Sequence, residues 1–409
     1  MNRLNLIMMA LALVLSAKAE VKTLKVKVAN PSSVERTAVP VVVPLAKQYS
    51  TALVKLGDKE IPCQLDDLND DGVYDELSFL TDMKKKEKQT FTVVLSTEGE
   101  PRQYQNQTYG YLGIRDRGAK NQKHQQIKSV TFPKETNPYN YIYPHGAVME
   151  NDMVGFRVYC DHRQSIDYYG HRQHKMDVKE TGFYTNDEQR AAGYGEDVLY
   201  TGSTYGCGAL HGWDGKNAIM FENVRNRTQT VVCEGPVRCI LDITNKGWRP
   251  YKGCKPLDIT TRYILYYGHR DVEVQVRFSR NVADVQLSTG IVDIVEGSEE
   301  FTDKAGLRGD WGRACAGNNP KVYDTITVGL GVYVPKQYYK ADSHFTDGKE
   351  RLPNQAYVQV VGTDTDNLHY WFNATCDIET FGFSGKEAWF DYLKKWKKEL
   401  DNPAVITIN

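Results

Sequence analysis

Short runs in which apolar and polar residues alternate recur along most of this 409-residue chain, and they constrain its fold more than any other feature. Clear cases are residues 21–28, 41–45 and 90–95. An alternation of period two puts every second side chain on the same face of a strand, so one face of each strand can join a core. Turn residues separate these first runs at spacings typical of a small sandwich. The pattern therefore predicts a mainly β protein.

The chain changes character at about residue 110, where the predicted strands become longer and the loops richer in Gly, Tyr and His. The polar stretch 98–108 lies between the two parts. All-β units often exceed the usual domain size, so one large β domain or two would both fit the length of the chain. We place a boundary in this polar stretch and predict two domains. A small N-terminal β-sandwich is expected over residues 20–105, and a large antiparallel β domain over residues 106–409.

One helix is predicted near the C-terminus. Ser384 and Glu387 have the spacing of a capping box. Four apolar residues then follow on one helical face: Trp389, Leu393, Trp396 and Leu400. Their spacing predicts that the helix packs on a sheet. Pro403 ends it, and residues 404–408 alternate like a closing strand.

The N-terminus has the three parts of a secretory signal. Arg3 is followed by the apolar run 4–16 and by Ala17-Lys18-Ala19, a small-x-small cleavage site. Residues 1–19 are therefore predicted to be a signal peptide, with the mature protein in the periplasm or outside the cell. The apolar run is shorter than the roughly 20 residues that span a bilayer, so we expect no membrane insertion. The balance of 51 basic and 52 acidic residues gives no attraction to nucleic acid.

The richest set of reactive side chains surrounds the predicted strand 154–160. Its apolar residues share one face: Val154, Phe156, Val158 and Cys160. Asn151, Arg157 and Tyr159 share the other, with His145 before them and Arg163 and Tyr169 after. Arg can hold a carboxylate with two hydrogen bonds, and Tyr or His can move protons. The pattern indicates binding of an acidic sugar, although a polar sheet face with satisfied hydrogen bonds would have the same pattern.

A second candidate segment is the glycine-rich loop 202–215, where glycines would permit close approach of a ligand. It contains Tyr205, His211 and Trp213. We interpret His211 as a candidate acid or base, and Tyr205 and Trp213 as sugar contacts. A connecting loop with an incidental histidine is the alternative interpretation. Tyrosine is frequent in the chain, at 26 residues against 13 phenylalanines, which suits stacking on sugar rings.

Metal and cysteine patterns are weaker. Asp67, Asn69, Asp71 and Asp75 follow the opening of a calcium loop, but its twelfth position is Ser78 instead of Glu. Both a structural calcium ion and a metal-free acidic turn fit this segment. No cofactor is otherwise expected. Of eight cysteines, Cys233 and Cys239 flank a turn and are either a local disulfide or two thiols.

Three segments carry a resemblance to a known family. They are DLNDDGVYDEL (67–77), ENDMVGFRVYCDHRQSIDYYGH (150–171) and DVLYTGSTYGCGAL (197–210). With the Trp-rich terminal helix, they resemble an exported Bacteroidetes family catalogued as domain of unknown function 4861. The resemblance implies a place in polysaccharide breakdown, often of uronate-containing glycans. It also implies that the large domain is an antiparallel β-supersandwich similar to the galactose-mutarotase fold.

Three functions remain open at this stage, all with an oligosaccharide or polysaccharide as ligand. The first is a lyase on uronate-containing oligosaccharides, with Arg157 and Asn151 on the carboxylate and with His145, Tyr159, Tyr169 or His211 moving protons. The second is a glycoside hydrolase that uses two carboxylates. Its candidates are Glu150, Asp167 and Asp197. The third is a non-catalytic glycan-binding protein.

Overall fold

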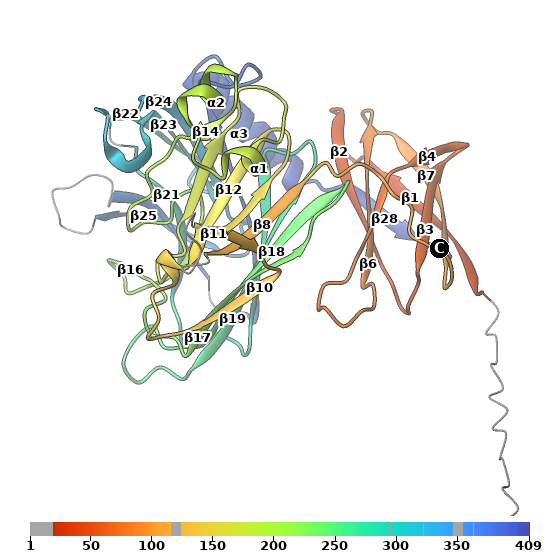
Figure 1. Ribbon diagram of the computed structural model, residues 1–409, viewed down its shortest axis with the longest axis horizontal. Coiled ribbons are helices and arrows are strands. Elements are labelled where there is room, and N and C mark those ends of the chain that lie inside the picture. Colours follow the sequence, from red (N-terminus) through yellow and green to blue (C-terminus); the bar gives the residue numbers. More distant parts are fainter. Residues whose placement is uncertain (1–18, 116–123, 295, 322, 347–354, 363) are drawn as a thin grey trace, which may run out of the picture.

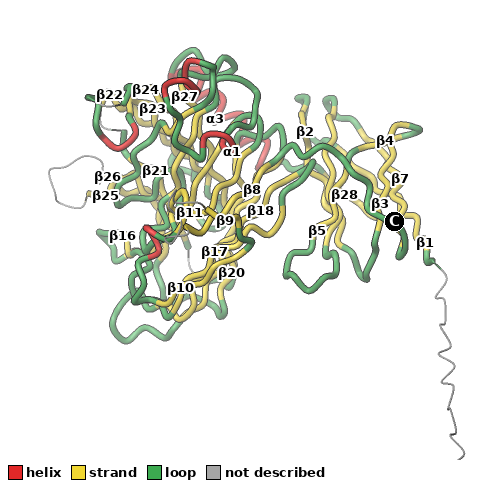
Figure 2. Tube along the Cα trace, in the orientation of Figure 1, coloured by secondary structure: helices red, strands yellow, loops and turns green. Residues whose placement is uncertain are grey.

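The computed structural model describes residues 19–115, 124–294, 296–321, 323–346, 355–362 and 364–409, and these form two β-rich lobes (Figure 1). Most of the predicted signal peptide lies outside the described residues. Strands dominate both lobes, and the helices gather on the large one (Figure 2). The prediction of a mainly β protein with one long C-terminal helix is confirmed.

The small lobe consists of two sheets that enclose their own hydrophobic core. The alternation in the sequence produces this core directly, because Phe91, Val93 and Leu95 point inward while their neighbours face outward. One sheet has the order β28-β1-β7-β3-β4 and the other β2-β6-β5. The strands are β1 Val21–Ala29, β2 Arg36–Pro44, β3 Thr51–Leu56, β4 Lys59–Ile61, β5 Cys63–Asp66, β6 Glu76–Met83, β7 Lys88–Ser96 and β28 Val405–Ile408.

The closing strand predicted at 404–408 is confirmed, and its partner lies at the other end of the chain. Strand β28 pairs antiparallel with β1, with Val26 opposite Ile408. The C-terminus therefore returns to the small lobe (Figure 1).

The large lobe contains three sheets in its described residues. Their orders are β10-β17-β18-β19-β20-β27-β24-β23-β22, β14-β13-β12-β11-β8-β9 and β16-β15-β21-β26-β25. The strands that begin the lobe are β8 Tyr109–Arg115, β9 His124–Gln126, β10 Ser129–Pro133, β11 Ile142–Glu150, β12 Val154–Tyr159, β13 Ile166–Gly170, β14 Glu196–Asp197, β15 Leu210–Trp213 and β16 Ala218–Ile219. Those that follow are β17 Asn226–Cys233, β18 Arg238–Trp248, β19 Leu257–Tyr266, β20 Asp271–Phe278, β21 Leu287–Val292, β22 Glu296–Thr302, β23 Leu307–Ala314, β24 Ile326–Tyr333, β25 Tyr339–Thr346, β26 Gln355–Val361 and β27 Asn367–Cys376.

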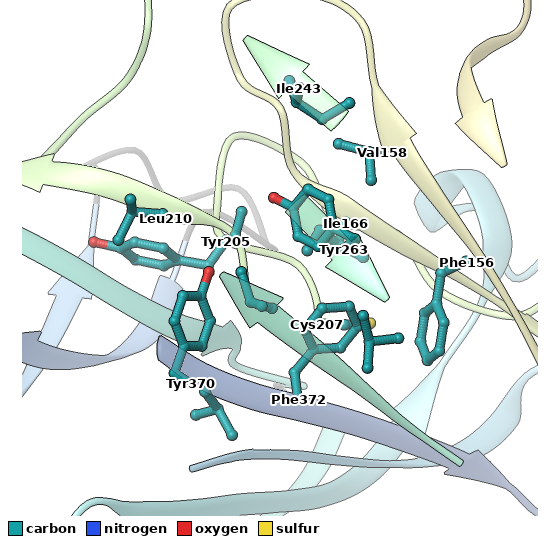
Figure 3. Close-up of a cluster of buried hydrophobic side chains, with 14 of the residues drawn as sticks. Phe156, Val158, Ile166, Tyr205, Cys207, Leu210, Ile243, Tyr263, Tyr370 and Phe372 are labelled. Atoms are coloured by element: carbon teal, nitrogen blue, oxygen red, sulfur yellow. The ribbon is translucent and has the colours of Figure 1, made fainter. Parts of the chain in front are cut away.

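One continuous hydrophobic cluster fills the space among these sheets. Figure 3 shows part of it, with Phe156 and Val158 of β12 near Ile166 of β13 and Phe372 of β27. The predicted division of β12 into an apolar and a polar face is confirmed, because its apolar residues through Cys160 are buried in this cluster. Most of its polar face is covered as well, because Gly155 and Arg157 are also buried and only Tyr159 is partly exposed.

The predicted C-terminal helix is α3, Lys386–Leu400, and its apolar face packs as expected. Trp389, Leu393 and Trp396 are buried against the nine-stranded sheet, and the Trp389 indole donates to the carbonyl of Leu330. The expected capping box is wrong, because the N-cap residue is Gly385 and not Ser384. None of the helices within the described residues has the length and apolar character needed to cross a bilayer.

The two lobes are joined through buried polar groups. The Gln64 side chain of β5 donates to the carbonyl of Arg238 and accepts from the backbone of Val237 and Arg238. The Arg238 guanidinium forms an ion pair with Asp66, and both side chains are almost fully buried. Buried polar groups need hydrogen-bond partners, so these contacts fix β5 of the small lobe against residues 237–238 of the large lobe.

Cys233 and Cys239 are free thiols, which resolves the question that the sequence leaves open. Cys233 lies opposite Ile240 across the β17–β18 ladder, next to an irregularity in the register. Cys239 belongs to the large core, whereas Cys233 packs with a separate cluster that includes Val237. The two sulfur atoms therefore lie on different faces of the sheet, where a disulfide cannot form.

Candidate functional site

Arg157 is the centre of a buried ion-pair cluster on the polar face of β12. Its Nη2 atom donates to Asp167 on β13, and to Asp197 on β14 at 3.3 Å. Its Nη1 atom donates to the carbonyl of Pro144 at 3.2 Å and to the Tyr184 hydroxyl at 2.8 Å. Only 2% of the Arg157 side chain is exposed. Its charge is therefore already neutralised within the protein.

Asp167 and Asp197 both pair with Arg157 but differ in exposure. The Asp167 side chain is 1% exposed and that of Asp197 is 16% exposed. Burial, together with the negative charge of Asp167, raises the pKa of Asp197 well above its usual range. Two carboxylates that share one cation favour a state in which one of them keeps its proton. Asp197 is the one that can reach a ligand.

Tyr159 connects this buried cluster to the surface. Its hydroxyl oxygen accepts a hydrogen bond from Arg157 at 2.8 Å and donates to Asp167 at 3.0 Å. Burial and the Asp167 charge raise the pKa of this phenol well above its usual range. Tyr159 therefore keeps its proton at neutral pH, beside a cation that would stabilise the phenolate if the proton left.

His145 precedes Gly146, which pairs with Tyr159 across the β11–β12 ladder, and it has an unusual backbone conformation. It follows the cis peptide bond Tyr143-Pro144 and has a φ of 67°, in the left-handed region. Its Nδ1 atom donates to the carbonyl of Tyr139 at 2.6 Å, and its ring stacks on the Tyr139 ring at 3.9 Å. Burial lowers the pKa of this imidazole. The ring is thus neutral at neutral pH, with the lone pair on Nε2.

Arg163 brings a second guanidinium to the same place. Its Cζ atom lies 4.9 Å from the centre of the Tyr159 ring and 5.5 Å from that of Tyr139. Asp161 holds it through Nε and Nη2, at 2.9 and 2.7 Å. Its Nη1 atom has only a 3.5 Å contact with the carbonyl of Gly202, so this nitrogen can still donate to a ligand.

Five partly or fully exposed side chains thus lie over the buried Arg157 cluster, and we call them the aromatic–arginine patch. They are Tyr139, His145, Tyr159, Arg163 and Tyr184. The rings of Tyr139 and Tyr159 lie 6.1 Å apart and nearly parallel. The patch combines flat apolar rings with groups that can donate or accept protons, as sugar sites do.

A cavity of about 220 Å³ adjoins the patch through Tyr143 and Pro144. Its wall includes Tyr109 and Tyr111 of β8 and residues of the short helix α1, Val178–Thr181. The segment 143–145 therefore faces a cavity at one end and the patch at the other.

Other predicted site residues lie elsewhere. His211 is fully buried, and its Nε2 atom donates to the backbone carbonyl of Arg163 at 2.6 Å. Asn151 is buried too. Its amide donates to the carbonyls of Tyr266 and His269, and its oxygen accepts from the backbone of Met153. These two side chains hold the backbone and do not join the patch.

The remaining predicted residues are also enclosed. The Tyr169 hydroxyl donates to the carbonyl of Gly195 at 2.7 Å, and the Tyr205 hydroxyl pairs with Ser288 at 2.9 Å. Trp213 is 5% exposed and belongs to the large core. Glu150 is fully buried and accepts from His171. Sugar stacking by Tyr205 or Trp213 would require the core to open.

The acidic turn 67–75 is held by its own hydrogen bonds. Asp67 accepts from the backbone of Asp70 at 2.7 Å and of Gly72 at 2.8 Å, and Asp75 accepts from Leu68. Asx turns of this kind need no ion. The calcium site at Asp67, Asn69, Asp71 and Asp75 stays a prediction.

Two residues of the patch, Tyr139 and Tyr184, were not predicted from the sequence. Tyr139 is six residues before His145 in an aromatic-rich segment, and that local richness is the signal that could have indicated it. Tyr184 follows α1, 25 residues after Tyr159, with no motif or periodicity that relates it to β12.

The family described as Domain of unknown function (DUF4861) matches residues 28–406 of the chain. No curated protein matches it. Among solved structures, it is similar to an alpha-mannosidase from Enterococcus faecalis V583, at 10% identity and a TM-score of 0.46, over 95% of this chain and 46% of that one. It is also similar to a protein in glycosyl hydrolase family 38 from Enterococcus faecalis, at 11% identity and a TM-score of 0.47, over 95% and 47%. The chain spans less than half the length of both structures, and likeness at this level carries no argument about activity.

Proposed function

Starting from the fact that the chain belongs to the family described as Domain of unknown function (DUF4861), we propose that it is an exported carbohydrate-active enzyme, a lyase on uronate-containing oligosaccharides. The observation that carries this proposal is the position of His145. A neutral imidazole with its Nδ1 proton fixed on the Tyr139 carbonyl has Nε2 as its basic atom. A phenol and a guanidinium lie near it. The Tyr159 ring is 6.1 Å from the Tyr139 ring on which His145 stacks, and the Arg163 guanidinium lies over both tyrosine rings.

Elimination from a uronate needs a cation on the carboxylate, a base and an acid. Arg157 already pairs with Asp167 and Asp197, so we assign the substrate carboxylate to Arg163, through Nη1. His145 Nε2 takes the proton from the carbon beside the carboxylate. The electron pair of that C–H bond becomes the new carbon–carbon double bond, and the bond from the adjacent carbon to the glycosidic oxygen breaks.

In this scheme the Tyr159 hydroxyl turns its proton from Asp167 to the departing oxygen and gives it up there. The Arg157 hydrogen bond at 2.8 Å would stabilise the phenolate that forms. Asp167 holds the phenol in place, and Tyr139 and Tyr184 offer rings for stacking on the sugars. The proton taken up by His145 returns to Tyr159 through water after product release.

The test is the ultraviolet absorbance of an unsaturated uronate product, measured with the purified protein on a panel of uronate-containing glycans. His145→Gln and Tyr159→Phe are expected to lower the rate at least about 100-fold, the usual contribution of a general base or acid. His174→Gln and Tyr200→Phe, which change exposed residues outside the patch, should keep full activity. Full activity in both patch variants, or no product from any uronate glycan, would refute the lyase proposal.

A glycoside hydrolase is the second candidate. Asp197 favours it, because its side chain is partly exposed and burial and the Asp167 charge raise its pKa well above the usual range. In that reaction Asp197 would be the general acid. Reducing sugar would then appear without new ultraviolet absorbance, and Asp197→Asn would abolish it. Binding of a glycan without any product, unchanged by His145→Gln, would indicate a binding protein.

Export is part of the proposal and has its own test. The mass of the protein purified from its native cells should correspond to a chain that begins at Glu20. Its presence in the periplasmic or extracellular fraction would agree with the predicted signal, and a full-length cytoplasmic chain would contradict it.

A further inference from the structure

Glu150, His171 and Asp177 form a buried cluster that the proposed reaction does not use. Glu150 ends β11, His171 directly follows β13, and Asp177 directly precedes α1. Their exposed fractions are 0%, 0% and 2%. One potential ligand atom from each lies within 4.8 Å of the others. Three separate segments thus direct metal-binding atoms to one buried point.

Several polar atoms of this cluster have no hydrogen-bond partner among the described residues. Glu150 Oε1 accepts from His171 Nε2 and from the backbone of Asp177 and Val178, whereas Oε2 has no partner. Asp177 Oδ2 accepts from Gly195, whereas Oδ1 has no partner and lies 3.8 Å from His171 Nε2. Buried polar atoms without partners are rare in folded proteins and indicate a missing water or ion.

We propose that Glu150, His171 and Asp177 bind one divalent transition-metal ion, with zinc as the best fit. The His171 nitrogen lies 2.8 Å from Glu150 Oε1 and 3.8 Å from Asp177 Oδ1. Two tetrahedral zinc ligands at about 2.0 Å from the metal are themselves ~3.3 Å apart, which lies between these values. Small side-chain shifts would therefore admit the ion.

The ligand chemistry selects the class of metal. Calcium and magnesium prefer sites made of oxygen alone, whereas an imidazole nitrogen with two carboxylates suits zinc or its neighbours. The charges agree as well. A divalent cation with a neutral imidazole and two carboxylates makes an electrically neutral cluster, which suits a buried place.

The metal would connect the ends of two strands to the segment that covers the candidate site. After Asp177 and α1, the chain passes Gly182 and places the Phe183 ring 4.2 Å from the Arg157 guanidinium, with the Tyr184 hydroxyl bonded to Arg157. Binding of a metal to the folded state stabilises it by mass action. The proposed role is thus structural and independent of the lyase reaction.

The test uses the full mature chain, freed of metal with a chelator and then titrated with zinc chloride. We expect one zinc ion per chain by calorimetry and elemental analysis, and a thermal midpoint that rises with zinc. Asp177→Asn keeps an oxygen for the Gly195 amide but removes the ligand charge, and should weaken zinc binding at least tenfold and abolish the midpoint shift. His171→Gln should act likewise.

The matched control is His174→Gln. His174 is 52% exposed and pairs with Asp152. This surface pair has the same two residue types as the buried His171 and Asp177. It should bind zinc like the wild type. Substoichiometric zinc in the wild type, or equal zinc binding in Asp177→Asn, would overturn the proposal and indicate a buried water instead. If His171→Gln does not fold, Asp177→Asn with its circular dichroism spectrum decides alone.

Discussion

Replacement of His211 by Gln should make the protein less sensitive to acid. His211 is fully buried, its Nε2 atom donates to the carbonyl of Arg163, and its Nδ1 atom has no partner among the described residues. Burial lowers the pKa of this imidazole to about 4. A glutamine amide can donate the same hydrogen bond from nearly the same place, but it does not titrate.

The magnitude follows from the difference between the folded and unfolded pKa. A histidine in an unfolded chain has a pKa of about 6.5, so the difference is ~2.5 units, which corresponds to about 3 kcal/mol. The sign follows from which state takes up the proton. Below the unfolded pKa the unfolded chain is protonated while buried His211 is still neutral. The contribution of neutral His211 to the free energy of unfolding is therefore complete above the unfolded pKa of about 6.5. It is lost as the pH falls from there to the folded pKa of about 4.

The assay is urea denaturation at about pH 7 and about pH 4 for the wild type, His211→Gln and the exposed control His174→Gln. Other groups titrate in all three proteins, so the comparison isolates His211. The variant should lose ~3 kcal/mol less than the wild type between the two pH values, and the control should lose as much as the wild type. An equal loss in wild type and His211→Gln would refute the reasoning, because His211 would then titrate alike in both states.

Three further outcomes are expected. Asp167→Asn should lower the free energy of unfolding by about 3–5 kcal/mol, because the neutral amide is a weaker partner for buried Arg157 than the carboxylate. An unchanged urea midpoint would contradict this prediction. Trp389→Ala should cost about 3–5 kcal/mol through the cavity under α3, and a loss below about 1 kcal/mol would mean that the helix contributes little to the large lobe. Cys233 and Cys239 should both react with iodoacetamide in denaturant without reductant, and protection of both would indicate a disulfide.

The properties that the sequence determined by itself are local. An alternation of apolar and polar residues puts Phe156 and Arg157 on opposite faces of β12 whatever surrounds the strand, because successive side chains of a strand always alternate. The same holds for α3, where helical spacing alone aligns Trp389 with Leu393. The one local error, a cap at Ser384 instead of Gly385, moved a boundary by one residue.

The tertiary structure decided which polar residues meet and which are enclosed. The alternating pattern around Arg157 would be the same whether its face of β12 were open to solvent or covered. It is covered because β14 and the segment after α1 bring Asp197 and Tyr184 to its guanidinium. The sequence offers both His145 and His211 as candidate bases, yet the core encloses His211 and leaves His145 partly exposed. Charge pairing and burial depend on segments far apart in the chain, and no local pattern encodes which segments those are.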